Sequence, residues 1–251
     1  MSAGSNTAQP TSDPKALPTS TASVLVIDVG GTHVKVLATG HRRPVKIDSG
    51  PHMTPGVMVK DVTTAVAHWK YDVISIGFPG PVKNGRPARE PWNLGKGWVG
   101  FDFRKAFKRP VRVINDAAMQ ALGSYAGGNM LFLGLGTGLG SSMIREGDLI
   151  PLELAHLPYK HGKSYEEYLG NAGMASLGKR AWRRQVAEVS ALFVAALEVD
   201  YVVLGGGNAR HLKRPPRHTR LGANANAFKG GFRLWRDMEK KRPARRLSRG
   251  P

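Results

Sequence analysis

The stretch VLVIDVGGTHVKVL, residues 24–37, places two short apolar runs on either side of a Gly-Gly-Thr turn. Short runs rich in β-branched residues and bounded by glycine predict buried strands, so this stretch predicts two strands joined by a tight turn. A second stretch, MLFLGLGTGLGSSMIR at residues 130–145, repeats the order of strand, Gly/Thr turn and strand. We therefore expect the chain to contain two related halves.

Further strand and helix patterns follow each copy. The expected elements are strands at 45–48, 73–77, 111–114, 148–151 and 202–204, and helices at 55–69, 117–125 and 174–197. Two βββαβα units that face each other across a cleft are the architecture of the actin-like, ribonuclease-H-like phosphotransferases. The sequence thus predicts an α/β protein of this actin-like fold, with two α/β domains around a cleft.

The domain boundaries follow from shifts in composition. Residues 1–23 are rich in Ser, Thr, Pro and Ala without apolar periodicity, which predicts a disordered leader. We expect a small N-terminal α/β domain at 24–115 and a larger C-terminal α/β domain at 116–223. A final helix at 224–235, weakened by its Gly pair, is expected to return to the small domain before a basic tail at 236–251.

Composition excludes several classes of protein. The 251 residues include no cysteine, which removes disulfides, thiolate zinc sites and cysteine nucleophiles. No apolar run approaches the roughly 18 residues that a membrane span needs, and the first residues lack a signal-peptide layout. We expect a soluble, cytoplasmic protein without a membrane partner.

The chain is strongly basic, with a formal net charge of +19. Fourteen Lys and Arg residues against two acidic residues lie after position 209. Such a surface attracts polyanions. Charge alone leaves nucleic acid, anionic lipid, polyphosphate and a nonspecific solubilising tail open.

The first Gly/Thr turn has the composition of an anion site. Gly30 and Gly31 can offer backbone N–H groups to a phosphate, and Thr32 can donate its hydroxyl. Asp28 would face the same site and hold Mg²⁺, directly or through water. Lys35 either contacts phosphate or is a solvated strand residue. The alternative for the glycines is an ordinary type I′ hairpin turn.

The second turn, Gly136, Thr137 and Gly138, lacks the Lys-Ser/Thr ending of a P-loop and the helix of a Rossmann fingerprint. As the structural partner of the first turn, it could hold the phosphates of one donor from the opposite side. Gly205, Gly206 and Gly207 follow a strand and would let a flat base or a polyanion approach the backbone. A tight strand-to-helix turn is the alternative there.

Asn115 and Asp116 come at a strand end, where side chains point into an interdomain crevice. Asp116 could accept the proton of a hydroxyl nucleophile as a general base. The alternative is that Asp116 caps the helix at 117–125.

Further polar residues could bind a hydroxylated ligand. Glu153 and His156 form a donor and acceptor pair of the kind that grips sugar hydroxyls. A metal site that includes His161 competes with this interpretation, and the absence of cysteine argues against zinc. Asn93 lies in a long loop at 83–100 and could contact a hydroxyl.

The motifs occur in one order, which is more specific than any of them alone. They are DVGGTHVK (28–35), GFPGP (77–81), WNL (92–94), VINDA (113–117), LGLGTGLGS (133–141), ELAH (153–156) and LGGGN (204–208). This set resembles the ROK family of sugar kinases and repressors, and within it the short polyphosphate/ATP glucokinases.

The resemblance implies a two-domain fold that closes on a hexose, as a homodimer, with Mg²⁺ and a phosphoryl donor, polyphosphate and/or ATP. It implies Asp116 as catalytic base, and sugar ligands at Asn93, Asn115, Asp116, Glu153 and His156. The two Gly/Thr turns match the phosphate loops, and Gly205–Gly207 match the turn beside the adenosine.

Two departures from the family pattern carry consequences. Members with a Cys-rich zinc motif place it just after Glu-x-Gly-His, so this chain is expected to bind no zinc and must hold the loop at 157–164 otherwise. Ala155 replaces the usual Gly in that segment.

The leading hypothesis is a glucokinase that phosphorylates the 6-hydroxyl of glucose, and the basic balance favours polyphosphate beside or instead of ATP. The alternatives are a kinase of mannose or N-acetylmannosamine, and a noncatalytic sugar-sensing or polyanion-binding protein on the same fold. No specific nucleic-acid partner is expected, because no nucleic-acid motif is present.

Overall fold

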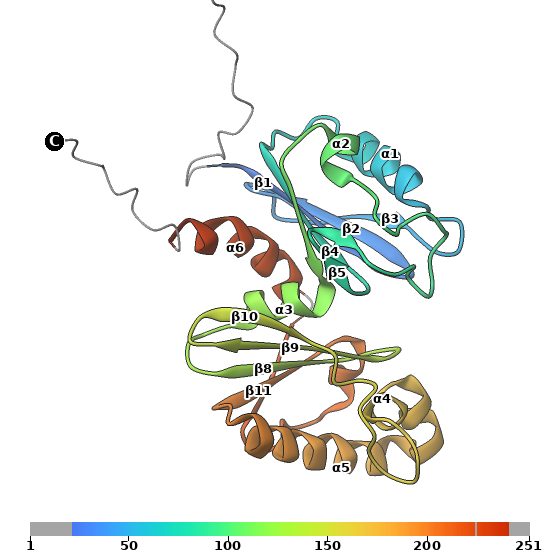
Figure 1. Cartoon of the computed structure of the whole chain (residues 1–251), viewed down its shortest axis with the longest axis vertical. Coiled ribbons are helices and arrows are strands. Elements are labelled where there is room, and N and C mark those ends of the chain that lie inside the picture. Colours follow the sequence, from blue (N-terminus) through green and yellow to red (C-terminus); the bar gives the residue numbers. More distant parts are fainter. Residues whose placement is uncertain (1–21, 224, 241–251) are drawn as a thin grey trace, which may run out of the picture.

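The computed structural model of the chain describes residues 22–223 and 225–240. Two five-stranded sheets form two lobes, and helix α3 (Asp116–Ser124) lies between them with α6 (Asn226–Lys240) beside it (Figure 1). Most of the expected leader and the end of the expected tail lie outside the described residues. Within the described ranges, no helix is long and apolar enough to cross a membrane.

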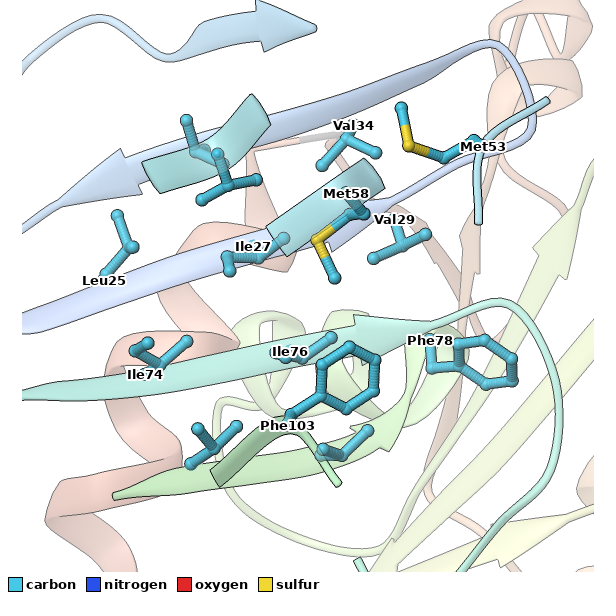
Figure 2. Packing of buried hydrophobic residues seen from close by; sticks show 14 of the residues in the cluster. Leu25, Ile27, Val29, Val34, Met53, Met58, Ile74, Ile76, Phe78 and Phe103 are labelled. Atoms are coloured by element: carbon cyan, nitrogen blue, oxygen red, sulfur yellow. The ribbon is translucent and has the colours of Figure 1, made fainter. Parts of the chain in front are cut away.

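The N-terminal sheet has the strand order β3-β2-β1-β4-β7. Its strands are β1 Val24–Val29, β2 His33–Ala38, β3 Val45–Asp48, β4 Val73–Phe78 and β7 Val111–Asn115. The first three pair antiparallel, and β1, β4 and β7 pair parallel. Helices α1 (Pro55–Ala65) and α2 (Phe103–Phe107) contribute Met58 and Phe103 to the apolar core on one face of this sheet (Figure 2).

The C-terminal sheet repeats this connectivity in the order β10-β9-β8-β11-β12. Its strands are β8 Met130–Leu135, β9 Leu139–Arg145, β10 Asp148–Leu152, β11 Tyr201–Gly205 and β12 Thr219–Leu221. Three antiparallel strands are again followed by parallel partners. The long helix α5 (Asn171–Leu197) packs on this sheet, with α4 (Tyr165–Leu169) before it and a backbone break at Gly178.

The first Gly/Thr turn is not a type I′ turn, and that alternative is wrong. Neither Gly30 nor Gly31 has a positive φ. The residues with that geometry are Asn84 (φ 52°) and Gly85 (φ 71°), which join β5 (Val82–Lys83) to β6 (Arg86–Pro87). Asn-Gly between two short strands is the favoured sequence for a type I′ hairpin. The region expected to be one long loop therefore begins with a hairpin.

Other element boundaries also differ from the sequence-based ones. The helix expected at 55–69 ends at Ala65, and the final helix runs to Lys240, five residues into the expected tail. Helix α2 and strand β12 were not predicted from the sequence, because both are too short to show a periodic pattern.

Helices α3 and α6 cross in direct backbone contact. A Cβ atom added at Gly230 of α6 would lie 1.7 Å from the carbonyl oxygen of Met119, and one at Gly123 of α3 would lie 1.8 Å from that of Asn226. Only glycine on both helices permits this approach. The glycine pair of the last helix thus weakens the helix locally but is required for its packing.

Helix α6 is also fixed to the N-terminal sheet. The hydroxyl of buried Ser75 on β4 donates to the carbonyl oxygen of Gly231 at 2.7 Å. Phe228 and Trp235 pack with Val24 and Val26 of β1. α6 therefore joins the last part of the chain to the first lobe and holds α3 against it.

We expect Gly230→Ala to lower the free energy of unfolding by about 3 kcal/mol, the upper end of the usual cost of overpacking, because the obstructing atoms are backbone. Urea unfolding followed by circular dichroism measures this. Gly56→Ala on α1 is the matched control, since its new methyl group meets nothing within 4 Å, and it should be neutral or stabilising by less than about 1 kcal/mol. Equal stability of the two variants would contradict the crossing.

Candidate active site

Asp28 lies near the end of β1 and is largely withdrawn from solvent, with its side chain 18% exposed. Lys35 is its register partner on β2, and the Lys35 Nζ atom is 3.8 Å from Asp28 Oδ2. Burial raises the pKa of the Asp28 carboxyl, and the charge of Lys35 opposes that rise only in part. Lys35 is thus a cation beside Asp28 rather than a fully solvated strand residue.

The N-cap of α3 is Asn115, so the alternative that Asp116 caps this helix is wrong. Asn115 Oδ1 accepts the N–H groups of Ala117 and Ala118 at 2.9 and 3.2 Å, and Asn115 Nδ2 donates to the Gly80 carbonyl at 3.1 Å. This leaves Asp116 as the first helical residue. The carboxylate of Asp116 accepts the N–H of Ala117 at 2.8 Å.

Asp116 has a pKa of about 7. Burial is the largest cause, the negative charge of Asp28 adds to it, and Glu153 raises the pKa further, while backbone N–H groups oppose the shift. The fold therefore brings three carboxylates from three segments within electrostatic reach. Because the pKa is higher in the folded state, ionisation of Asp116 costs stability as pH rises from about 4 to 7.

The first Gly/Thr turn lies against the predicted sugar ligand Asn93. A Cβ atom at Gly31 would lie 3.0 Å from Asn93 Cβ. The N–H of Gly30 donates to the His33 carbonyl at 3.1 Å and is already engaged. Within the described residues no acceptor bonds the N–H groups of Gly31 and Thr32, so these two are available to an anion.

The second Gly/Thr turn is held by two neighbouring segments, the start of α5 and a short helix that follows β11. The carbonyl of Gly136 accepts the N–H of Asn171 at 3.0 Å and the side-chain amide of Asn208 at 3.1 Å. Asn208 also donates to Asn171 Oδ1 at 2.7 Å. It lies on the short 3-10 helix η1 (Gly207–His211), which follows the Gly205–Gly207 turn. Asn208 is the last residue of the LGGGN motif (204–208), for which the sequence indicated a role only at its glycines.

Glu166 is a second residue that sequence reasoning missed. Its carboxylate accepts the N–H of Leu139 at 3.1 Å, and its own N–H donates to the Ala155 carbonyl at 3.0 Å. It therefore connects the second turn to the segment that carries Glu153 and His156. Ser164 and Glu167 form a capping box at the start of α4. This pattern can be read from the sequence, but it gives no signal for the carboxylate of the neighbouring Glu166.

Glu153 and His156 project from a segment fixed by its backbone. Leu154 N–H donates to Ser141 Oγ at 3.1 Å. The side chains of Glu153 and His156 are both mostly exposed, and His156 Nε2 lies 3.8 Å from Glu153 Oε1. His161 does not join them in a metal site, since within the described part of the chain no three His, Cys, Asp or Glu residues are grouped to hold a metal ion.

Aromatic and ionic contacts hold the loop at 157–164. The Tyr159 ring stacks on Tyr165 with 4.6 Å between centroids, and its hydroxyl lies 2.9 Å from Glu188 Oε1 and 3.1 Å from Gln185 Oε1. Lys160 forms an ion pair with the same Glu188 of α5. The hydrogen bonds from Lys160 and Tyr159 lower the pKa of Glu188. The loop is thus anchored to α5 without cysteine.

Two α/β lobes with repeated Gly/Thr turns, and a carboxylate of raised pKa at the start of the intervening helix, define the actin-like class of phosphotransferase folds. The ROK family model matches residues 24–151, so the chain belongs to the ROK family.

Sequence relatives agree with this assignment. The chain is 27% identical over 212 residues to polyphosphate glucokinase of Mycobacterium leprae, a match that covers 75% of this chain and 64% of that protein. It is 29% identical over 206 residues to polyphosphate glucokinase of Mycobacterium tuberculosis H37Rv, covering 73% and 77%. The chain thus spans slightly less than two thirds of the first relative and about three quarters of the second.

Solved structures confirm the predicted fold. The inorganic polyphosphate/ATP-glucomannokinase of an Arthrobacter species superposes with a TM-score of 0.69 at 24% identity, covering 86% of this chain and 98% of that one. A ROK family glucokinase of Streptomyces griseus, solved with glucose and AMPPNP, gives a TM-score of 0.68 at 16% identity, covering 85% and 99%.

We expect Asp28→Asn to lower the pKa of Asp116 below 7, because it removes the neighbouring negative charge, while burial keeps that pKa above its ordinary value. Titration of the Asp116 carboxyl carbon by NMR, in the wild type and in Asp28→Asn, measures this pKa. Asp48→Asn is the control, since the Asp48 side chain is fully exposed on edge strand β3. A titration of Asp116 that does not respond to Asp28→Asn would contradict this electrostatic coupling.

Proposed function

We propose that this protein is a glucokinase that transfers a phosphoryl group from polyphosphate and/or ATP to the 6-hydroxyl of glucose. The observation that carries the proposal is the Asp116 carboxylate, with a pKa of about 7, at the start of the helix between the two lobes. Membership of the ROK family and similarity to polyphosphate glucokinases support it.

Asp116 acts as the general base. Its carboxylate takes the proton of the glucose 6-hydroxyl while that oxygen forms a bond to the terminal phosphorus of the donor. The bond from this phosphorus to the bridging oxygen breaks, which leaves glucose 6-phosphate and a donor shortened by one phosphate. A base with a pKa near the working pH combines a substantial ionised fraction with enough driving force for proton transfer.

Exposed polar side chains around the Asp116 carboxylate bind the sugar in this proposal. Asn93, Glu153 and His156 have groups free for hydroxyls, and they come from both lobes. Asn115 is mostly engaged as a helix cap, so it offers the sugar only the second hydrogen of Nδ2. Asn115 thus orients Asp116 as well as contributing to the sugar site.

The two Gly/Thr turns bind the donor phosphates, with Gly31, Thr32 and Lys35 on one lobe and Gly136–Gly138 on the other. With ATP as donor, Gly205–Gly207 would lie beside the nucleoside. Asp28 fits Mg²⁺ because this ion prefers oxygen ligands and is held by one or two carboxylates together with substrate phosphates. When bound, Mg²⁺ neutralises charge that develops on the transferred phosphoryl group.

The homodimer, the cytoplasmic location, and the expectation of no zinc, no membrane partner and no specific nucleic acid remain predictions. So do the domain boundaries at residues 115/116 and 223/224.

A coupled assay that crosses glucose, mannose and N-acetylmannosamine with ATP and polyphosphate tests the proposal. We expect glucose to give the highest kcat/KM with at least one donor. A clear preference for another hexose would replace glucose in the assignment. Absence of turnover in every combination, with sugar binding intact by calorimetry, would support the noncatalytic alternative.

Asp116→Asn should lower kcat about 10²–10⁴-fold, the usual contribution of a general base, while the folded structure is retained. The matched control is Asp61→Asn on α1. This helix packs on the face of the N-terminal sheet opposite to α3, so the control should keep near-normal activity. Near-normal turnover of Asp116→Asn would contradict the assignment of the base.

A further inference from the structure

A cluster of cationic side chains lies where α5 meets η1. Arg183 Nε donates to the carbonyl oxygen of His211 at 2.7 Å, and Arg210 Nε lies 3.4 Å from His211 Nε2. Lys179 comes one helical turn before Arg183 and so lies on the same face of α5. Lys179, Arg183, Arg210 and His211 are called the distal cluster below.

The distal cluster has no counter-charge. Within the described ranges, none of its three permanent cations forms an ion pair with a carboxylate. The side chains of Lys179 and Arg210 are exposed. Desolvation, followed by the charges of Lys179, Arg210 and Arg183, lowers the pKa of His211. Cations that are held together without a neighbouring carboxylate favour binding of an anion.

This cluster is connected to the second Gly/Thr turn by the contacts of Asn208 and Asn171. Asn208 belongs to the same 3-10 helix as Arg210 and His211, and it donates to the Gly136 carbonyl. Asn171, the first residue of α5, donates its N–H to the same oxygen. Lys179 and Arg183 follow the backbone break at Gly178, on the second part of α5, and Arg183 contacts η1 through the His211 carbonyl.

We propose that the distal cluster binds the phosphates of an inorganic polyphosphate chain that lie beyond the ones held by the Gly/Thr turns. This inference rests on the proposed function for the placement of the reacting phosphate. The three phosphates of ATP are used at the turns, and the remaining nucleoside carries no charge for these cations. A longer polyphosphate continues with one or more negative charges on every unit, so it alone gains from the cluster.

A nucleic acid is disfavoured as the natural ligand. Binding of single strands combines cations with aromatic side chains on which bases stack. Of the four residues in the cluster, only His211 has a ring. Arg183 contacts the backbone carbonyl of His211, and Arg210 contacts the edge of its imidazole. A chain of phosphates without bases matches this surface better.

The variant that tests the proposal is Lys179→Gln with Arg210→Gln. Both side chains are exposed, so the substitutions should leave the fold intact. Arg42→Gln with Arg43→Gln is the matched control, because it removes the same charge from an exposed loop at the end of β2 remote from the first Gly/Thr turn. Calorimetry on the full chain measures binding of long-chain polyphosphate, tripolyphosphate and single-stranded RNA without requiring catalysis.

We expect the cluster variant to bind long-chain polyphosphate about ten-fold more weakly, with a salt dependence reduced by a slope of about 1 to 2 as two cations are lost. Binding of tripolyphosphate and the KM for ATP should stay unchanged, and the control should match the wild type. An equal loss in the control, an equal loss for tripolyphosphate, or tighter binding of RNA than of polyphosphate would overturn the proposal.

A second readout is the titration of His211 by NMR. Long-chain polyphosphate should raise the pKa of His211, because phosphate anions stabilise the imidazolium and neutralise its cationic neighbours. Tripolyphosphate should leave it unchanged. An unresponsive His211 at saturating polyphosphate would overturn the distal site. If these binding results hold while no donor supports phosphorylation of any hexose, the proposed function fails and the anion site stands.

Discussion

Helix α3 approaches its neighbours closely only because they present glycine at the contact. Gly230 of α6 meets the backbone of Met119, and Gly77 of β4 leaves space for the Met119 side chain, where a Cβ atom would lie 2.3 Å from Met119 Cε. The helix is thereby fixed between the two lobes, and its first residue, Asp116, lies between the segments that we propose bind the sugar and the donor. The site depends on this packing more than on any single polar contact.

The same placement explains the electrostatics. Withdrawal from solvent raises the pKa of Asp116 toward neutrality, and the negative charge of Asp28, near the end of β1, adds to the shift. Asn115 takes the capping hydrogen bonds, so the carboxylate of Asp116 keeps most of its acceptor capacity. Because the buried Asp116 carboxylate is costly to ionise, it is suited to take up a proton. The packing of α3 against glycine stabilises the fold in spite of this cost.

The repeated order of strand, Gly/Thr turn and strand was sufficient to predict the fold, because buried strands and glycine turns leave a local pattern. The Asn-Gly sequence at residues 84–85 also predicts a type I′ turn, but this turn was considered only as an alternative for Gly30–Gly31. The role of Gly230 was not readable, since a glycine pair in a helix gives the same local signal whether it weakens the helix or permits a crossing. Glu166 and the distal cluster were missed for a similar reason, because their partners lie far away in the sequence.

In the proposed function, the position of α3 gives Asp116 the pKa and the location of a general base. The pH dependence of kcat/KM for glucose tests this role most directly. We expect a fall in kcat/KM on the acid side with an inflection near pH 7, because only the ionised carboxylate accepts the proton, and this inflection should move to lower pH in Asp28→Asn. A profile that stays flat between about pH 5 and 8 would contradict it.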